Sequence, residues 1–507
     1  MASPLRTLEG TPLIYESPLS WRMRWVSKLS RSEWILIAVF VLSVPAVNPY
    51  IRGDGNEYYA YVRSIVIDHD LNFENEYRKG DPAFLRAAFD ENGVLRQSQG
   101  PGDGFLGLMP NGYVHNPASV GPSLLWSPFF IVAHGSVLLL NQFGAKIPAD
   151  GYSLPYRWVC ALATVIYAFM GLVLAFKIAS RFVDERIALV GTVGIWFASS
   201  LPVYMYFLPF HAPALSSFGV ALFIWMWLKN REKDSLREWA LWGAAAGLMV
   251  QLYYLNGVFL LIPLLEWFRG LTGTQPVSIS RLIRPVALGI IFAVALVTSM
   301  LPNFIIKGII YGSALRTGYS TGWFTWSAPH LAEVGFSSEH GMFLWTPILL
   351  FALVGLCLLW RRHRWVAAEL AGASALFYYA VSSFVNWHGN SSFGSRFFVS
   401  LTPVFVLGLA VLAAECRSTL SRRVMCGFAA VVVLMIAWNI GFIFQWGTNI
   451  VPNRGPVDFS EVARNQVTIV PQRVFGFVVN YLWSRDKVTR AVEQEDLKEL
   501  PQAPAEK

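Results

Sequence analysis

The chain has 507 residues, of which 54% are hydrophobic and 14% are charged. A soluble protein carries about 25% charged residues, so this composition excludes an ordinary soluble enzyme and predicts a polytopic membrane protein. The formal net charge of +8 does not indicate nucleic-acid binding, because no basic face alternates with aromatic residues along a soluble domain. We therefore expect a lipid bilayer, and no nucleic acid, among its partners.

The N-terminal segment 1–32 is basic and precedes the first apolar run, which begins near Trp34. This order predicts an uncleaved first transmembrane helix, with the segment before it in the cytoplasm. All four cysteines lie in or beside apolar runs, so neither a disulfide framework nor a cysteine-based metal site is expected.

Apolar stretches long enough to cross a bilayer recur along the whole chain. A transmembrane helix needs about 20 apolar residues, and about eleven stretches approach that length. The candidates lie at about 33–50, 119–141, 157–178, 187–208, 211–229, 239–266, 283–306, 342–360, 365–385, 398–416 and 424–446. The expected fold is therefore an all-α bundle of about eleven transmembrane helices.

The orientation of these candidates follows from the first one. With the N-terminus inside, odd-numbered candidates end outside and even-numbered candidates end inside. Residues 51–118, 307–341 and 386–397 are then outer loops. The loops 361–364 and 416–423 fall inside, and both are basic, as the positive-inside rule requires. The orientation of the fourth and fifth candidates is left open, because the stretch LPVYMYFLPFHAP between them carries three prolines.

Residues 33–446 form a single transmembrane module in this scheme, without a recognisable internal repeat. The tail 447–507 lies outside and is short for a soluble domain. Its end, EDLKELPQAPAEK, has a composition typical of disorder.

The first outer loop opens with a helical pattern. From Glu57 onward, apolar side chains recur at Tyr58, Val62, Ile65 and Val66, which is a helical spacing. Such a helix can lie in the membrane interface with its tyrosines toward the lipid headgroups.

Two acids at the start of this helix, Asp54 and Glu57, allow two interpretations. Asp54 could cap the helix with Glu57 three residues later, as in a capping box. Alternatively, the pair could supply a general base, or a ligand of a divalent ion, at the mouth of the bundle. The loop is acidic, with ten Asp or Glu against six Lys or Arg between 51 and 118, which suits the second interpretation.

Three further outer segments carry polar side chains. His115 precedes the second candidate span, and His340 precedes the eighth. Trp387 and Arg396 lie on the Gly- and Ser-rich turn NWHGNSSFGSRFF. His115 alone is typical of an exposed loop histidine. The guanidinium of Arg396 can hold a phosphate in bidentate fashion or can snorkel to the interface.

Together these segments resemble the GT-C superfamily of membrane glycosyltransferases, and most closely the protein O-mannosyltransferases and lipid A aminoarabinose transferases. The acidic motif D-E-x-x-Y of that group follows the first helix. Asp54 takes the Asp position and Tyr58 the Tyr position, while Gly55 stands in place of the second acid and Glu57 is the candidate to replace it.

Other motifs extend this resemblance over most of residues 33–416. HNP at 115–117 is similar to the Lys-Pro or His-Pro motif of the group, although Asn116 stands directly before the proline. The stretches Pro117–Phe130, Gly341–Pro347 and Trp387–Arg396 look like motifs of uncharacterised bacterial relatives.

The resemblance implies transfer of a sugar from a polyprenyl-phosphate donor to an acceptor hydroxyl, with inversion. It makes Asp54 and Glu57 the catalytic carboxylates, with Asp54 as the residue that deprotonates or orients the acceptor hydroxyl. It places Arg396, His115, His340 and Trp387 at the lipid phosphate. A divalent ion, with Asp54 as one ligand, could assist, and no other cofactor is implied. The implied location is a bacterial plasma membrane, with the site on its outer face.

Three other functions remain open. A transporter or flippase would place polar residues in mid-helix, and His134, His211 and Asn256 are the main examples. An inactive subunit of an envelope assembly and an enzyme like the O-antigen ligases are the others.

Overall fold

The computed structural model describes residues 29–98, 106–233, 235–272, 279–419 and 422–499. Over these ranges every regular element is helical, as expected from the sequence. The longer helices are α1 (Arg31–Ser43), α5 (Gly121–Gln142), α6 (Leu154–Ala179), α7 (Glu185–Ala198), α8 (Ala212–Lys233), α9 (Leu236–Leu252), α10 (Leu261–Thr272), α11 (Ile279–Tyr311), α14 (Ile348–Ser383), α15 (Thr402–Thr419), α16 (Arg422–Gly447) and α18 (Val470–Glu499). The shorter ones are α2 (Gly55–Arg63), α3 (Glu74–Tyr77), α4 (Pro82–Ala88), α12 (Leu331–Phe336), α13 (Met342–Trp345) and α17 (Phe459–Thr468).

Among the described residues, 6 helices are long and apolar enough to cross a membrane. They are Gly121–Gln142, Leu154–Ala179, Ala212–Arg231, Ile283–Tyr311, Arg396–Arg417 and Cys426–Gly447. These helices are those of an integral membrane protein. The predicted count of about eleven spans stays a prediction, because α1, α7 and α9 have only 13, 14 and 17 residues.

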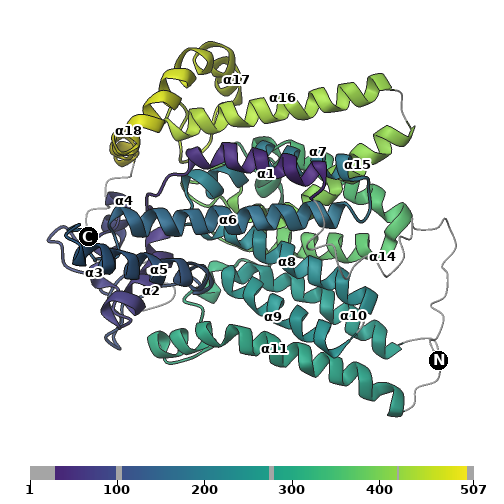
Figure 1. Ribbon diagram of the computed structural model, residues 1–507, viewed down its shortest axis with the longest axis horizontal. Coiled ribbons are helices and arrows are strands. Elements are labelled where there is room, and N and C mark those ends of the chain that lie inside the picture. Colours follow the sequence, from purple (N-terminus) through teal and green to yellow (C-terminus); the bar gives the residue numbers. More distant parts are fainter. Residues whose placement is uncertain (1–28, 99–105, 234, 273–278, 420–421, 500–507) are drawn as a thin grey trace.

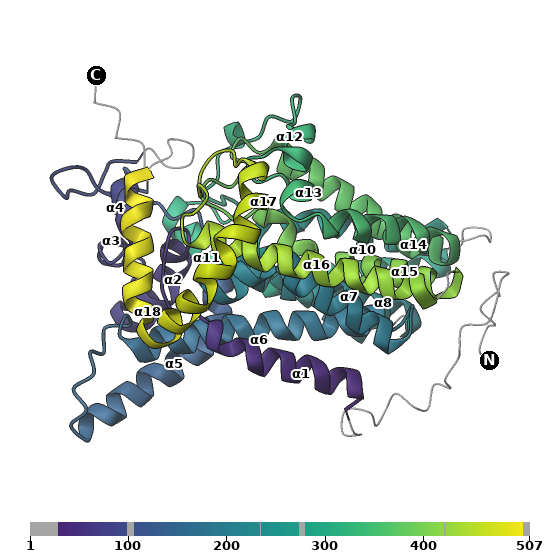
Figure 2. The same ribbon diagram turned by 90° about the horizontal axis from the view of Figure 1, so that it is seen from above.

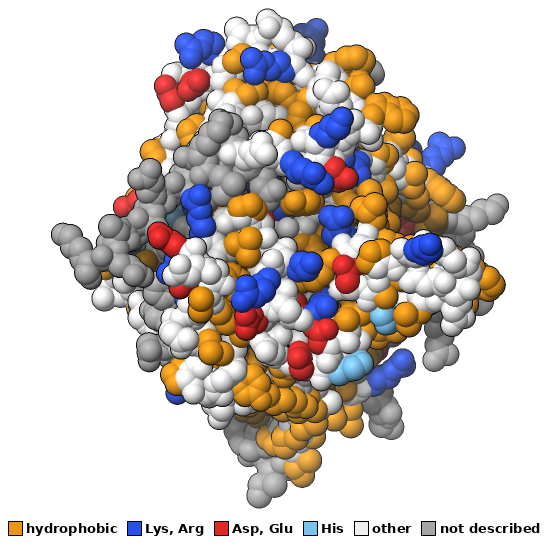
Figure 3. Space-filling model, turned by 90° about the vertical axis from the view of Figure 1, so that its left-hand side faces the viewer, with side chains coloured by type: hydrophobic (Ala, Val, Ile, Leu, Met, Phe, Trp, Pro, Cys, Tyr) orange, Lys and Arg blue, Asp and Glu red, His pale blue; other side chains and the backbone are white. Residues whose placement is uncertain are grey.

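Most of the long helices run side by side, and the short helices α2, α3 and α4 gather at one end of the bundle (Figures 1 and 2). We call this the loop end. Viewed onto the loop end, basic and acidic side chains mix over the centre of the face, while hydrophobic side chains gather toward its rim (Figure 3). The loop end therefore presents charged side chains of both signs at its centre (Figure 3).

The predicted directions of the second and third spans are wrong. The connection between α5 and α6 lies at the loop end, where Arg63 Nε donates to Asp150 O at 3.1 Å. At its other end α6 approaches the start of α1, since Lys177 forms an ion pair with Glu33 at 3.4 Å. Thus α6 runs antiparallel to α1, whereas the prediction made the two parallel. Apolar length alone could not reveal that α5 returns to the loop end.

The fourth predicted span also ends at the loop end. Beyond α7 the chain forms a π-helical turn, η4 (Val203–Phe207), and the Asn48 amide donates to Tyr206 O at 2.7 Å. The sixth predicted span is in fact two helices, α9 and α10, joined by η5 (Tyr254–Leu260). The break begins where Tyr253 adopts an extended conformation.

The predicted helix after Asp54 is present as α2, but its tyrosines do not face the headgroups. Tyr58, Tyr59 and Tyr61 are all buried. Two of the hydroxyls donate to backbone carbonyls, Tyr59 to Gly151 O and Tyr61 to Asn116 O, the latter at 3.0 Å. These tyrosines therefore join the first loop to the bundle.

The C-terminal tail forms two helices, α17 and α18, which pack back on α16 (Figure 1). Phe477 of α18 meets Phe444 of α16 edge-on, with 5.2 Å between ring centroids. Of the stretch predicted to be disordered, the part up to Glu499 belongs to α18, and 500–507 lie outside the described residues.

Candidate functional site

An ion pair joins the first loop to the turn before α15. Arg396 Nη1 lies 2.8 Å from Asp54 Oδ2. Asp54 precedes α2, and Arg396 begins a 3-10 turn, η7 (Arg396–Leu401). The structure thus brings together the two residues that carried most weight in the sequence.

The capping interpretation of Asp54 is wrong. Its backbone is already helical, with φ −55° and ψ −21°, and its side chain makes no hydrogen bond to the start of α2. A capping residue normally has an extended backbone. The carboxylate is instead turned toward Arg396.

Three features fix the backbone around Asp54. Gly53 has φ +50°, a conformation that favours glycine, and its amide donates to Asp81 Oδ2 at 2.6 Å. Asn56 Nδ2 donates to the same oxygen at 3.0 Å. A Cβ atom on Gly55 would lie 2.9 Å from Phe210 Cβ. The glycine in place of the second acid is therefore required by close packing.

The two carboxyl groups of the site, Asp54 and Glu57, differ in protonation state. Burial is the largest single influence on Asp54 and opposes its ionisation, but the charge of Arg396, its hydrogen bond and smaller contributions together outweigh burial and lower the pKa of that carboxyl. Burial and the negative charge of Asp54 raise the pKa of Glu57 to about 8. At neutral pH, Asp54 is therefore ionised and Glu57 protonated.

His211 completes this polar group. Its Nε2 lies 3.0 Å from Arg52 O, and burial lowers its pKa to about 4. The ring is therefore neutral at pH 7.

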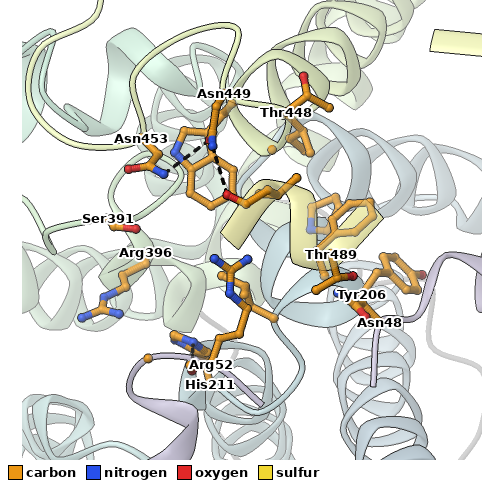
Figure 4. Close-up of a pocket in the computed structure, with 18 of the residues that line it drawn as sticks. Asn48, Arg52, Tyr206, His211, Ser391, Arg396, Thr448, Asn449, Asn453 and Thr489 are labelled. Carbon is orange, nitrogen blue, oxygen red and sulfur yellow. Dashed lines mark hydrogen bonds between the residues drawn. The ribbon is translucent and has the colours of Figure 1, made fainter. Parts of the chain in front are cut away.

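These residues line a cavity of about 750 Å³ at the loop end. Figure 4 shows Arg52 extending into the cavity from the wall that carries His211, with Asn449 and Asn453 on the opposite side. The polar part of the lining comprises Asn48, Arg52, Asp54, Glu57, Asp81, His211, Asn390, Ser391, Arg396, Thr448, Asn449, Asn453, Arg454 and Thr489.

Another part of the same cavity is apolar. Its lining includes Phe197, Phe207, Leu208, Ile440, Ile443, Phe444, Val474, Phe477, Val478 and Tyr481. The cavity is therefore amphiphilic, because charged and polar side chains and aromatic and aliphatic side chains all contribute to its lining.

Three predicted site residues lie outside this lining. His115 is buried rather than exposed, and its Nδ1 lies 3.1 Å from the Tyr311 hydroxyl. His340 is buried against Trp345, with 4.8 Å between ring centroids. Trp387 packs beside His330. The structure thus does not bring these three to the cavity of Asp54 and Arg396.

Sequence reasoning missed several residues of the site. Arg52 lies two residues before Asp54, so the same motif could have suggested it. His211 was named only among the polar residues that a transporter would place in mid-helix, and Asp81 was not singled out. No sequence pattern indicated that α18 lines the cavity, because its residues belong to a segment that was expected to be a short outer tail.

The donor set does not fit a divalent ion. Among the described residues, no three His, Cys, Asp or Glu side chains are grouped so that they could hold a metal. Asp54 is paired with Arg396, and Asp81 Oδ2 already accepts from Gly53 and Asn56. We therefore derive no step through a metal.

Comparison with known proteins adds no assignment. No known protein family matches the chain, and no curated protein matches it either.

Proposed function

We propose that the protein is a membrane glycosyltransferase that moves a sugar from a polyprenyl-phosphate donor to an acceptor hydroxyl, with inversion. The observation that carries this proposal is the pairing of Asp54 with Arg396 in a cavity whose lining is partly apolar. A carboxylate suits the acceptor hydroxyl, a guanidinium suits the phosphate, and an apolar wall suits the prenyl chain.

In the proposed reaction Asp54 accepts the proton of the acceptor hydroxyl. The hydroxyl oxygen forms a bond to the anomeric carbon as the bond from that carbon to the phosphate oxygen breaks. The electron pair of the broken bond goes to the departing lipid phosphate. The cationic side chains of Arg396 and Arg52, both in the lining, offset that growing negative charge.

The ion pair implies that the donor must bind before Asp54 can act as a base. In the empty site Arg396 keeps Asp54 ionised and makes it a weak base. A donor phosphate competes with Asp54 for the guanidinium, so donor binding raises the proton affinity of Asp54. Glu57 is protonated at neutral pH, so its carboxyl group can donate a hydrogen bond. The base therefore becomes effective only when the donor is present.

The proposal includes a location. The loop end faces the outer side of a bacterial plasma membrane, and about eleven helices cross the bilayer. The basic stretch 361–364, which lies at the kink of α14 at His363, and the basic stretch 416–423 then face the cytoplasm.

The proposal is tested by incubating purified protein with a panel of polyprenyl-phosphate sugars and an envelope extract that supplies acceptor hydroxyls, and following lipid phosphate by mass spectrometry. A glycosyltransferase releases lipid phosphate from at least one donor. A transporter or flippase binds or moves the donor without cleaving it, so intact donor throughout the panel would contradict the proposal.

A further inference from the structure

Helix α18 presents apolar side chains on two sides. Phe477 and Tyr481 line the cavity. On the other side, Phe475 and Trp483 are 77% and 84% exposed. A surface helix of a water-soluble domain carries one apolar face and one polar face. The first half of α18, residues 470–483, therefore has an apolar outer face that another apolar phase must cover.

That phase is the lipid of the bilayer. Figures 1 and 2 both show α18 beside the ends of α1 and α16. On those helices Leu42 and Leu434 are exposed as well, so α1, α16 and α18 all carry exposed apolar side chains. Tryptophan at the end of such a surface is typical of a membrane interface.

A narrow seam separates this lipid-facing surface from the cavity. It lies between α18 and the turn after α1, η2 (Val44–Ala46). The Tyr481 hydroxyl donates to Ala46 O at 2.9 Å, and Arg485 Nη2 donates to Pro45 O at 2.7 Å. Ala46 and Tyr481 line the cavity, whereas Leu42 and Trp483 lie on the exposed side.

The rest of the C-terminal unit is fixed on α16. Gln466 Nε2 donates to Trp438 O at 2.8 Å, and Gln445 Nε2 donates to Val462 O at 3.1 Å. In α18 itself the helix is broken at Ser484, where φ is −138° and ψ is 41°. The two seam contacts flank this break, so the seam can part while α17 stays on α16.

We propose that α18 is a lateral gate, which parts from η2 to let a lipid chain pass from the bilayer into the cavity. The identity of the ligand rests on the proposed function; the movement of the gate does not. A lipid-borne donor cannot leave the bilayer for water without exposing its chain, so a lateral path fits such a ligand better than a path through the polar face.

The first test locks the seam. In a background without the native cysteines, Ala46→Cys with Tyr481→Cys is joined by a short bismaleimide. Prenyl phosphate added after cross-linking should associate at least tenfold more slowly, and prenyl phosphate bound beforehand should be retained.

The control is Gly441→Cys with Gln466→Cys, which ties α16 to α17 away from the cavity. A Cβ on Gly441 would meet the Gln466 side chain, and cysteine at 466 shortens that side chain. This control should bind and release prenyl phosphate at the uncross-linked rates. Equal rates for the seam cross-link would overturn the gate.

The second test needs no ligand. Spin labels at Leu42→Cys and Trp483→Cys flank the seam, and pulsed electron paramagnetic resonance in lipid nanodiscs reports the distance between them. A gate predicts two distances, with the longer one enriched in Tyr481→Phe combined with Arg485→Gln. One unchanged distance would overturn the gate. Two distances in a protein that binds no prenyl phosphate would retain the gate and reject the proposed function.

Discussion

The ion pair between Asp54 and Arg396 should couple the stability of two segments that are far apart in the sequence. Breaking a buried pair costs about 3–5 kcal/mol, whereas an exposed pair contributes about 0.2–1 kcal/mol. Arg396 is 16% exposed and Asp54 is 46% exposed, toward the cavity. We therefore expect a coupling energy between these limits, about 1–3 kcal/mol.

A double-mutant cycle measures this coupling. The variants are Asp54→Asn, Arg396→Gln and the combination, and the free energy of unfolding is measured in mixed micelles at pH 7. Asparagine and glutamine keep the approximate shapes but remove the charges. The matched control is the pair of Arg78 and Glu74, which lies 2.6 Å apart at 50% and 41% exposure and should couple by about 0.3–0.5 kcal/mol. Additive effects at Asp54 and Arg396, within about 0.3 kcal/mol, would refute the reasoning.

Three further predictions follow from the geometry of the site and of the bundle. The pKa of Glu57 is raised to about 8 in the folded protein, so the stability of the wild type should fall as pH rises from about 4.5 to about 8. Melting temperatures of Glu57→Gln that fall as steeply as those of the wild type over that pH range would contradict the assignment. Gly55→Ala should lower stability by about 1–3 kcal/mol because its Cβ meets Phe210, and a melting temperature equal to wild type would count against that contact. Cysteines at Val94 and Lys146 should react with an impermeant maleimide in intact cells while one at Glu185 should not; the reverse result at Lys146 and Glu185 would support the helix directions expected from sequence.

The helical class and the choice of Asp54 and Arg396 as candidate site residues were within reach of the sequence, for different reasons. Apolar length identifies helices because the bilayer sets a minimum span. Asp54 and Arg396 were found because each sits in a short motif on a predicted outer loop. That they pair directly depends on the packing that brings the residue before α2 to the start of η7, which no local pattern reports.

The directions of the first few helices could not be predicted from the sequence. The stretch that forms α5 is as apolar as a spanning helix, yet the connection that follows it contacts Arg63 through Asp150 O. The stretch 239–266 reads as one long apolar run, yet it breaks at Tyr253. Both errors come from counting apolar residues, because the count does not record whether a helix continues across the bundle or turns back.

The part of the cavity lining that α18 supplies could not be predicted from the sequence either. Phe475, Phe477, Tyr481 and Trp483 are spread over a segment with many charges, and its mean composition is that of a polar tail. Only the packing against α16 and η2 shows that these aromatic side chains face a cavity on one side and are exposed on the other.

The central claim, that Asp54 activates the acceptor for attack on a lipid-linked sugar, is tested most directly by Asp54→Asn. Lipid phosphate release is followed by mass spectrometry under single-turnover conditions, and donor binding is measured on the same samples. A general base contributes about 10²- to 10⁴-fold, so release should slow by that factor. Binding should stay equal or become tighter, because Arg396 no longer has Asp54 as a competitor for the phosphate. Release at the wild-type rate by Asp54→Asn would contradict the account.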